Sequence, residues 1–246
     1  MRRRLLPLAL LLLAAAPAWA EQPAECRVAE NLIEPSFRLP QVARALAAKH
    51  LNVLVMGAGS SQLPAGNAYP ARLQRALAEK LPGVEIKVTT DVKAGRTAAE
   101  MVKGLPASLD STKPALLVWQ TGTVDAMLGI DPDQFSQALD KGVKMARSAG
   151  ADVILINAQY SPRTESMIAL GTYVEDMRWV ALQQEVPLFD RFSIMKLWGE
   201  LGTFDLNSAT KKLDIAERVH DCIGRLLADM VIAAAKSEEP PTDGSR

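Results

Sequence analysis

Residues 51–62 read LNVLVMGAGSSQ, an apolar run that ends in two glycines and two serines. The segment 53–56 (VLVM) has no polar alternation, which is typical of a strand covered on both faces at the centre of a parallel sheet. The glycines permit a tight turn whose backbone N–H groups face a ligand. Ligands of open α/β sheets bind just past the carboxyl end of a central strand, where Ser60 or Ser61 would serve as a nucleophile. The plainer interpretation is a turn whose serines cap the next helix.

The chain begins MRRRLLPLALLLLAAAPAWA, which is three arginines, an apolar run and a small-residue A-x-A site. This pattern predicts a secretory signal peptide over residues 1–20, cleaved before Glu21. We therefore expect a periplasmic or secreted protein with a single domain over 21–236 and a disordered tail over 237–246. No other segment is apolar and long enough to cross a bilayer, so no membrane insertion is expected after cleavage.

Charge and cysteine content exclude several classes of function. The 246 residues contain 28 Lys and Arg and 28 Asp and Glu. The sequence has no basic patch that would indicate nucleic-acid binding. Cys26 and Cys222 lie at opposite ends of the mature chain and can form a disulfide in an oxidising compartment. Two histidines and two isolated cysteines do not make a metal cluster, so we expect neither a metal nor a cofactor.

Strand-like and helix-like segments alternate along the chain. Apolar or β-branched runs predict strands at 53–56, 84–89, 115–119, 152–157 and 187–190. Helical periodicity predicts helices at 41–49, 69–81, 97–105, 131–150, about 166–184, after the last strand to about 198, and 214–235. This alternation predicts an α/β fold, a three-layer α/β/α sandwich with a five-stranded parallel sheet.

Four loops leave the carboxyl ends of these strands and should open on one rim of the sheet: 57–61, 93–96, 120–125 and 159–163. A hydroxyl nucleophile there needs a base, and the chain has two histidines. His50 directly precedes the central strand and so lies at the opposite end of the sheet, which leaves His220. A carboxylate three residues before that histidine can hold the ring's other nitrogen and stabilise the imidazolium. The alternative is a structural histidine.

The order of these motifs resembles that of the SGNH/GDSL hydrolases over nearly the whole mature chain. VLVMGAGSS is similar to the strand and Gly-Asp-Ser of the first block, and Gly95 to the loop glycine of the second. Residues 122–125 (GTVD) stand for Gly-x-Asn-Asp, and 217–220 (ERVH) for Asp-x-x-His. The stretches AYPARL, VWQTGT and VPLFDRF also look like flanking sequences of bacterial members. The resemblance implies a flavodoxin-like SGNH hydrolase fold.

Two motifs depart from the family pattern. Aligned without a gap, the family serine falls on Gly59, whereas a shift of one residue makes Ser60 the nucleophile and a shift of two makes it Ser61. The asparagine whose amide would donate to the oxyanion is Val124 here. Losing one such donor typically costs on the order of a hundred- to a thousandfold in rate. Backbone N–H groups of the serine turn and of Gly95 would form a reduced oxyanion hole.

Further positions complete the expected site and core. The triad aspartate is replaced by Glu217, with Asp214 as a substitute one helical turn earlier. Gly122 and Asp125 of the third block, and Tyr160 in the fourth loop, are candidates for lining the pocket. Three tryptophans at apolar positions are expected in the core: Trp119, Trp179 and Trp198.

The resemblance implies a periplasmic ester hydrolase in which Ser60 or Ser61 attacks an acyl carbonyl and His220 takes the hydroxyl proton. Glu217 or Asp214 would orient the imidazole. Family and compartment point to O-acetyl or other short acyl esters on glycans, or to lipid esters, as substrates. The alternative is a catalytically impaired relative that binds a glycan or a protein partner. A periplasmic solute-binding protein is disfavoured because those usually need two lobes.

Overall fold

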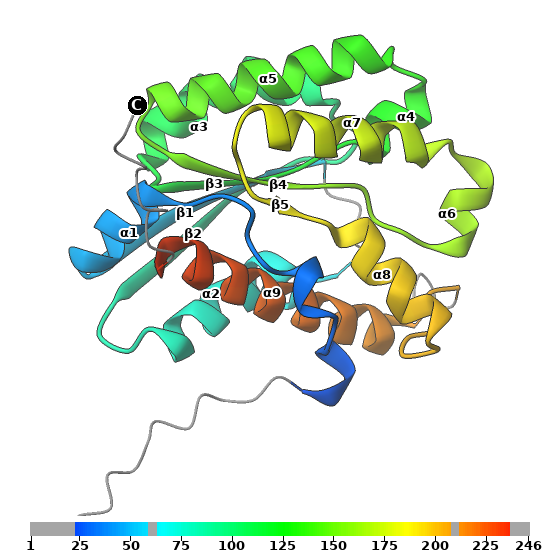
Figure 1. Ribbon diagram of the computed structural model, residues 1–246, viewed down its shortest axis with the longest axis horizontal. Helices are drawn as coiled ribbons and strands as arrows, with labels where there is room; N and C mark the ends of the chain where they lie inside the picture. Colours follow the sequence, from blue (N-terminus) through cyan, green and yellow to red (C-terminus); the bar gives the residue numbers. More distant parts are fainter. Residues whose placement is uncertain (1–22, 59–62, 208–211, 237–246) are drawn as a thin grey trace, which may run out of the picture.

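The computed structural model describes residues 23–58, 63–207 and 212–236. Five strands form one parallel sheet in the order β2-β1-β3-β4-β5. Their bounds are β1 His50–Gly57, β2 Glu85–Val92, β3 Leu116–Gln120, β4 Asp152–Ile156 and β5 Leu188–Phe189. Helices cover both faces of this sheet (Figure 1). The predicted three-layer α/β/α sandwich with a five-stranded parallel sheet is confirmed.

The two helical layers are formed by helices from different parts of the chain (Figure 1). One layer contains α1 (Pro40–Ala47), α2 (Tyr69–Lys80), α8 (Arg191–Glu200) and α9 (Leu213–Lys236). The other contains α3 (Ala98–Thr112), α4 (Thr123–Leu128), α5 (Pro132–Ser148) and α7 (Leu170–Gln183). The short α6 (Pro162–Met167) follows β4, and the described residues also form three 3-10 turns: η1 (Ala24–Cys26), η2 (Glu30–Leu32) and η3 (Ala65–Asn67).

The central strand β1 supplies side chains to both hydrophobic cores. Val53 and Val55 pack in the core beneath α2 and α9, whereas Leu54 and Met56 pack in the core beneath α3 and α5. Because successive side chains of a strand point to opposite faces, a strand between two helical layers needs apolar residues at every position. This is the physical reason for the unbroken apolar run in the sequence.

Two helices differ from the expected segments. Helix α3 starts at the expected place, where Thr97 and Glu100 form a capping box, but it continues past the expected end at Leu105, through Pro106, to Thr112. The continued helix buries Leu109, which joins the same core, and this packing outweighs the hydrogen bond that proline removes. The single helix expected over 166–184 is instead α6 and α7, and the turn after β3 contains the unexpected α4.

The predicted disulfide between Cys26 and Cys222 is present and joins η1 to α9. Trp119 and Trp198 are fully buried, as expected. Trp179 is 62% exposed, so its assignment to the core was wrong. It lies on α7, whose neighbouring Met177 and Val180 face the core and leave it on the outer side. No helix among the described residues is long and apolar enough to span a membrane.

Candidate functional site

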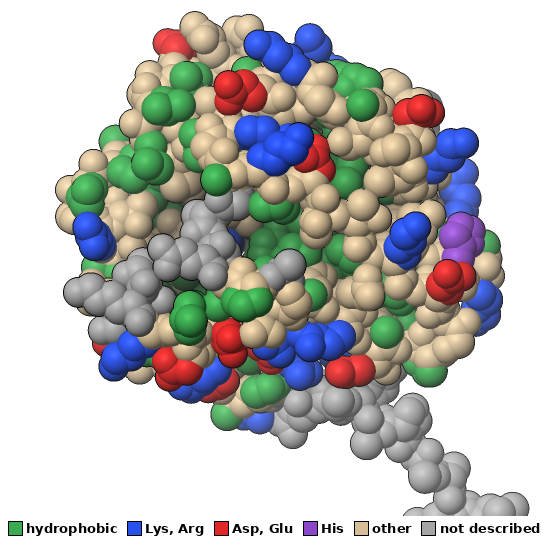
Figure 2. Space-filling view, turned by 180° about the vertical axis from the view of Figure 1, so that it is seen from behind, with side chains coloured by type: hydrophobic (Ala, Val, Ile, Leu, Met, Phe, Trp, Pro, Cys, Tyr) green, Lys and Arg blue, Asp and Glu red, His purple; other side chains and the backbone are tan. Residues whose placement is uncertain are grey.

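A cavity of about 620 Å³ lies at the carboxyl edge of the sheet. Residues at or just past the ends of all five strands line it: Gly57, Val92, Gln120, Gln159 and Arg191. Figure 2 shows this face, where hydrophobic side chains form the floor of a hollow and charged side chains lie above and below it. His220 of α9 also lines the cavity, so the fold brings the predicted base to the end of β1. His50 is exposed at the first residue of β1, at the opposite end of the strand.

The predicted nucleophile segment follows Gly57, which lines this cavity. Gly59, Ser60 and Ser61 lie outside the described residues. The described chain on either side of them, at Gly57 and Leu63, lines the cavity wall. The choice between the two serines therefore stays a prediction.

His220 is 8% exposed, and its Nδ1 accepts a hydrogen bond of 3.0 Å from the backbone N–H of Tyr69. Tyr69 is the first residue of α2, a helix with no side-chain cap of its own, so the imidazole satisfies an N–H that would otherwise lack a partner. Because Nδ1 accepts, the neutral ring carries its proton on Nε2. Burial, with smaller effects of Arg191 and Arg72, lowers the pKa of His220 to about 3. The ring is therefore neutral at physiological pH.

The carboxylates expected to orient this ring are engaged elsewhere or lie at the surface. Oε1 of Glu217 accepts from the side-chain amide of Asn67 at 2.8 Å. Asp214 is exposed in the first turn of α9. The expected pairing of a carboxylate with His220 is therefore not found in the described part of the chain, because the N–H of Tyr69 occupies Nδ1.

The motif residues of the expected oxyanion hole gather in a second cavity of about 290 Å³. Ala58, Gly95 and Val124 all line it, and Gln120 lines both cavities. Gly95 has a φ of +80°, which a turn between β2 and α3 requires of glycine. The alternation of strands and helices thus correctly predicted that these loops meet at one rim, beside the end of β1. Val124 brings no side-chain donor to the site.

Asp125 and Gly122 contribute to the scaffold, and their expected role in binding stays a prediction. Asp125 is 1% exposed and accepts from the backbone N–H of Ala98 at 2.9 Å and from the hydroxyl of Thr121 at 3.2 Å. Burial raises the pKa of its carboxyl above the ordinary value. These contacts tie the first turn of α3 to the loop after β3. Gly122 faces the core, where a Cβ would meet the ring of Phe135 at 3.5 Å.

Tyr160 is also a core residue and does not line either cavity, which corrects the expectation from its loop position. Its ring packs edge-on against Phe192 at a centroid distance of 5.3 Å and lies under the ammonium of Lys196. Both partners belong to α8, a helix that covers the loop after β4. Sequence position alone could not show that this helix folds back over the loop.

Arg191 is the cavity residue that the sequence analysis missed. It is 2% exposed, and one guanidinium nitrogen donates to Oε1 of Gln159 at 3.0 Å. The guanidinium carbon lies 5.9 Å from the ring centroid of Tyr69. Burial lowers the pKa of Arg191 to about 10. The sequence signal for this residue is its place at the end of the last strand, in the stretch VPLFDRF. Because Asp190 directly precedes Arg191, an ion pair between the two was the simpler expectation.

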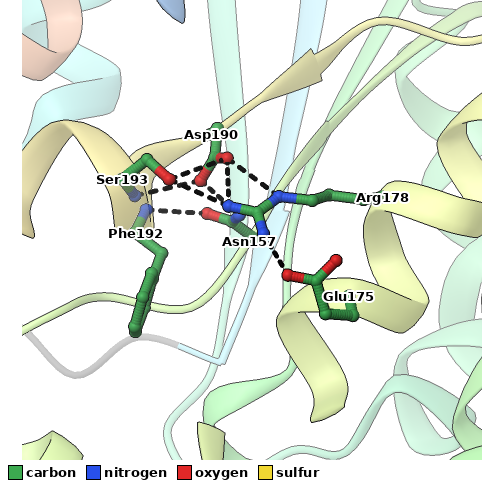
Figure 3. Close-up of polar contacts among 6 residues, drawn as sticks. All are labelled: Asn157, Glu175, Arg178, Asp190, Phe192 and Ser193. Carbon is green, nitrogen blue, oxygen red and sulfur yellow. Dashed lines mark hydrogen bonds and ion pairs between the residues drawn. The ribbon is translucent and has the colours of Figure 1, made fainter. Parts of the chain in front are cut away.

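Asp190 instead pairs with a different arginine (Figure 3). Its carboxylate accepts from Nε and a second nitrogen of Arg178 at 3.0 and 2.6 Å, and from the amide of Asn157 at 2.7 Å. It also caps α8 by accepting from the N–H of Ser193. Burial alone would raise the pKa of Asp190, but these partners lower it below its ordinary value. The network fixes the ends of β4 and β5, and with them the start of α8.

No group of three or more His, Cys, Asp and Glu side chains able to hold a metal comes together within residues 23–58, 63–207 and 212–236. The polar side chains that line the large cavity carry one imidazole, two guanidinium groups, amides and hydroxyls. Their chemistry is hydrogen bonding and proton transfer.

Residues 25–237 match the Non-GDSL lipase-like family. The chain belongs to this family. The family description agrees with the sequence GAGSS, which stands where the related hydrolases carry Gly-Asp-Ser. Together with the fold, this match confirms the resemblance to SGNH/GDSL hydrolases.

Named relatives of this Non-GDSL lipase-like protein include Esterase TesA of Pseudomonas aeruginosa, 35% identical over 100 residues that cover 41% of this chain and 49% of TesA. An arylesterase of Vibrio mimicus is 27% identical over 113 residues, covering 45% and 56% of the two chains. The chain thus spans about half the length of the curated relatives it matches.

Solved structures extend the likeness over more of the fold. The crystal structure of TesA superposes with a TM-score of 0.57 and 26% identity, covering 72% of this chain and 98% of TesA. A two-domain esterase active on acetylated mannans superposes with a TM-score of 0.67 and 14% identity, covering 84% and 56%. The second match carries information on the fold alone.

Proposed function

We propose that this protein is an ester hydrolase whose active site is the large cavity at the carboxyl end of β1, and that it works in the periplasm or outside the cell. The observation that carries the proposal is that His220 and Gly57, far apart in sequence, line one cavity. The names of the relatives support the reaction class. The signal-like N-terminus and the disulfide support the compartment.

In the proposed reaction, the hydroxyl of Ser60 or Ser61 attacks the acyl carbonyl, and Nε2 of His220 takes the hydroxyl proton and returns it to the leaving alcohol. Water then hydrolyses the acyl-enzyme and releases the acid. In the structure Nε2 carries a proton, because Nδ1 accepts from the N–H of Tyr69. Catalysis therefore requires the ring to give up that hydrogen bond and move its proton to Nδ1. A ring with a pKa of about 3 is also a weak base, so we expect slow turnover.

The oxyanion of the tetrahedral intermediate would lie near Ala58 and Gly95, whose loops meet in the smaller cavity. Backbone N–H groups there would replace the side-chain amide that Val124 lacks. The absence of that donor predicts a rate on the order of a hundred- to a thousandfold below that of a site that has it.

Small acyl esters fit the proposed site as substrates. The large cavity holds about 620 Å³ and has apolar walls that include Leu63, Pro70 and Val92. An aryl or short acyl ester fits within such a space, and one relative is an arylesterase. We therefore propose short acyl esters of aryl or sugar alcohols as the substrate class.

Hydrolysis of p-nitrophenyl acetate by purified mature protein tests the proposal. We expect one of the variants Ser60→Ala and Ser61→Ala, and also His220→Gln, to lose at least about a hundredfold in kcat/KM. His50→Gln is the matched control and should keep full activity, because His50 is exposed at the far end of β1. Equal activity in all four variants would rule out a serine–histidine mechanism.

A second candidate function is ligand binding without turnover. The hydrogen bond from Tyr69 to His220 and the missing donor at Val124 favour it. A wild-type protein that hydrolyses no ester, but is stabilised against heat by a ligand of the cavity, would support this candidate over the hydrolase.

A further inference from the structure

We propose that the large cavity binds the carboxylate of a ligand with an apolar body, and that Arg191 and the Nε2–H group of His220 hold that carboxylate. If the bound ligand is also the substrate, this inference rests on the proposed function. The binding itself requires no turnover, so the two can be tested apart.

Arg191 is a buried cation without an anionic partner among the described residues. The other buried or half-buried arginines pair with carboxylates: Arg72 with Asp221, Arg96 with Asp91, Arg178 with Asp190, and Arg225 with Asp221. Among the described residues, the hydrogen-bond partner of the Arg191 guanidinium is the neutral amide of Gln159, and its Nε is buried with no partner there. Burying a charge is costly unless it is paired, so this arrangement indicates that a partner comes from outside.

The acidic side chains close to Arg191 and His220 in the sequence already accept hydrogen bonds from other residues. The carboxylate of Asp190, next in the chain, faces Arg178, Asn157 and Ser193. Glu217 on α9 accepts from Asn67. Two of the undescribed stretches, 59–62 (GSSQ) and 208–211 (SATK), which interrupt the described chain, contain no Asp or Glu. The anion that complements Arg191 is therefore best supplied by a ligand.

His220 adds a second donor to the same cavity. Its Nδ1 is taken by the N–H of Tyr69, which leaves Nε2–H as the polar group of the ring that can meet a ligand. Tyr69 also packs its ring against the guanidinium of Arg191. The one tyrosine thus positions both donors, and Gln159 fixes the guanidinium from the other side.

Charge and shape identify the ligand as a monoanion with an apolar part. Of the two arginines that line the cavity, Arg191 is the buried one. With the neutral imidazole of His220, it gives the buried part of the cavity a single positive charge, which one carboxylate balances. A carboxylate also matches the fork of guanidinium donors. The walls formed by Leu63, Pro70, Val88 and Val92 suit an alkyl or aryl body. Arg75, exposed at the cavity lining, adds positive charge that attracts an anion.

Isothermal titration calorimetry of the mature protein with hexanoate and with its neutral analogue hexanamide tests this inference. We expect wild-type protein to bind hexanoate at least about tenfold more tightly than hexanamide, the size of effect expected for charged hydrogen bonds. Arg191→Met should weaken hexanoate binding by at least about tenfold and leave hexanamide binding unchanged. Arg191→Lys, which keeps the charge but not the fork, should retain part of the preference.

Arg163→Met serves as the matched control, because Arg163 is exposed on α6 and does not line the cavity; it should bind hexanoate like wild type. Equal binding of hexanoate and hexanamide, no binding of either, or hexanoate binding untouched by Arg191→Met would overturn the inference. Tighter binding of methyl phosphate than of hexanoate would overturn the assignment of a carboxylate. Ester hydrolysis is measured separately, so a protein that binds hexanoate through Arg191 but hydrolyses nothing would refute only the hydrolase.

Discussion

Arg178 and Arg191 both lie near the carboxyl end of β5, yet their surroundings differ in kind. Arg178 donates to Asp190 and Ser193, and its side chain is about one-third exposed (Figure 3). Arg191 follows Asp190 directly in the chain, is 2% exposed, and donates to the neutral Gln159. The more deeply buried cation is thus the one without a carboxylate among the described residues.

This difference separates a residue that holds the scaffold from one that faces a ligand. A buried charge with a full set of partners fixes its neighbours, and removing it leaves those partners unsatisfied. A buried charge without a counter-ion contributes little to folding, because its desolvation is not offset. We therefore expect substitution by methionine to lower the free energy of unfolding at Arg178 but not at Arg191.

The largest effect is expected for Arg178→Met. It removes the donors that hold Asp190 and Ser193, and leaves a carboxylate that is mostly buried with fewer partners. We expect the free energy of unfolding, measured with urea at pH 7, to fall by about 3 kcal/mol. Arg163→Met on the exposed surface of α6 should change it by less than about 0.5 kcal/mol. Equal stabilities for the two variants would show that the Asp190 network does not hold the scaffold.

A smaller effect is expected from pH, through His220. Its pKa falls from 6.5 to about 3 on folding, so between these pH values the unfolded chain binds a proton that the folded chain does not. Stability must then decrease as the pH falls below about 6.5, and the loss should reach roughly 2 kcal/mol at pH 5. The test is urea unfolding of wild type and His220→Gln at pH 7 and pH 5.

The glutamine variant can keep an acceptor for the N–H of Tyr69 but cannot titrate, so its loss between pH 7 and pH 5 should be smaller than that of wild type by this amount. His50→Gln, which changes an exposed histidine, should lose as much as wild type. If wild type and His220→Gln lost the same stability between pH 7 and pH 5, the conclusion that His220 is buried in its neutral form would be wrong.

The sequence was a good guide to the fold because its signals are local. The apolar run of β1, the capping box of Thr97 and Glu100, and the Asp-Pro start of α5 each depend on a few neighbouring residues. The parallel order of strands then places every exit loop on one rim. This is why the meeting of Gly95 and Val124, and of Gly57 and His220, could be predicted.

The partners of the site residues could not be predicted in the same way. His220 caps α2 through a backbone N–H, just as Asp152 caps α1 by accepting from the N–H groups of Gln41 and Val42. Helix N-termini offer such N–H groups whatever their sequence, so no residue pattern marks the pairing. The adjacency of Asp190 and Arg191 also did not indicate the partner of either side chain, because the side chains of neighbouring residues at a helix start point in different directions.

The smallest expected effect, that of Arg191→Met on the unfolding of the ligand-free protein, tests the central claim most directly. Urea unfolding at pH 7 would compare this variant with wild type and with Arg178→Met. If Arg191 is kept as a buried charge for a ligand, the variant should be as stable as wild type within about 1 kcal/mol, or more stable. A loss of about 3 kcal/mol, like that expected for Arg178→Met, would contradict the account and place Arg191 in the scaffold.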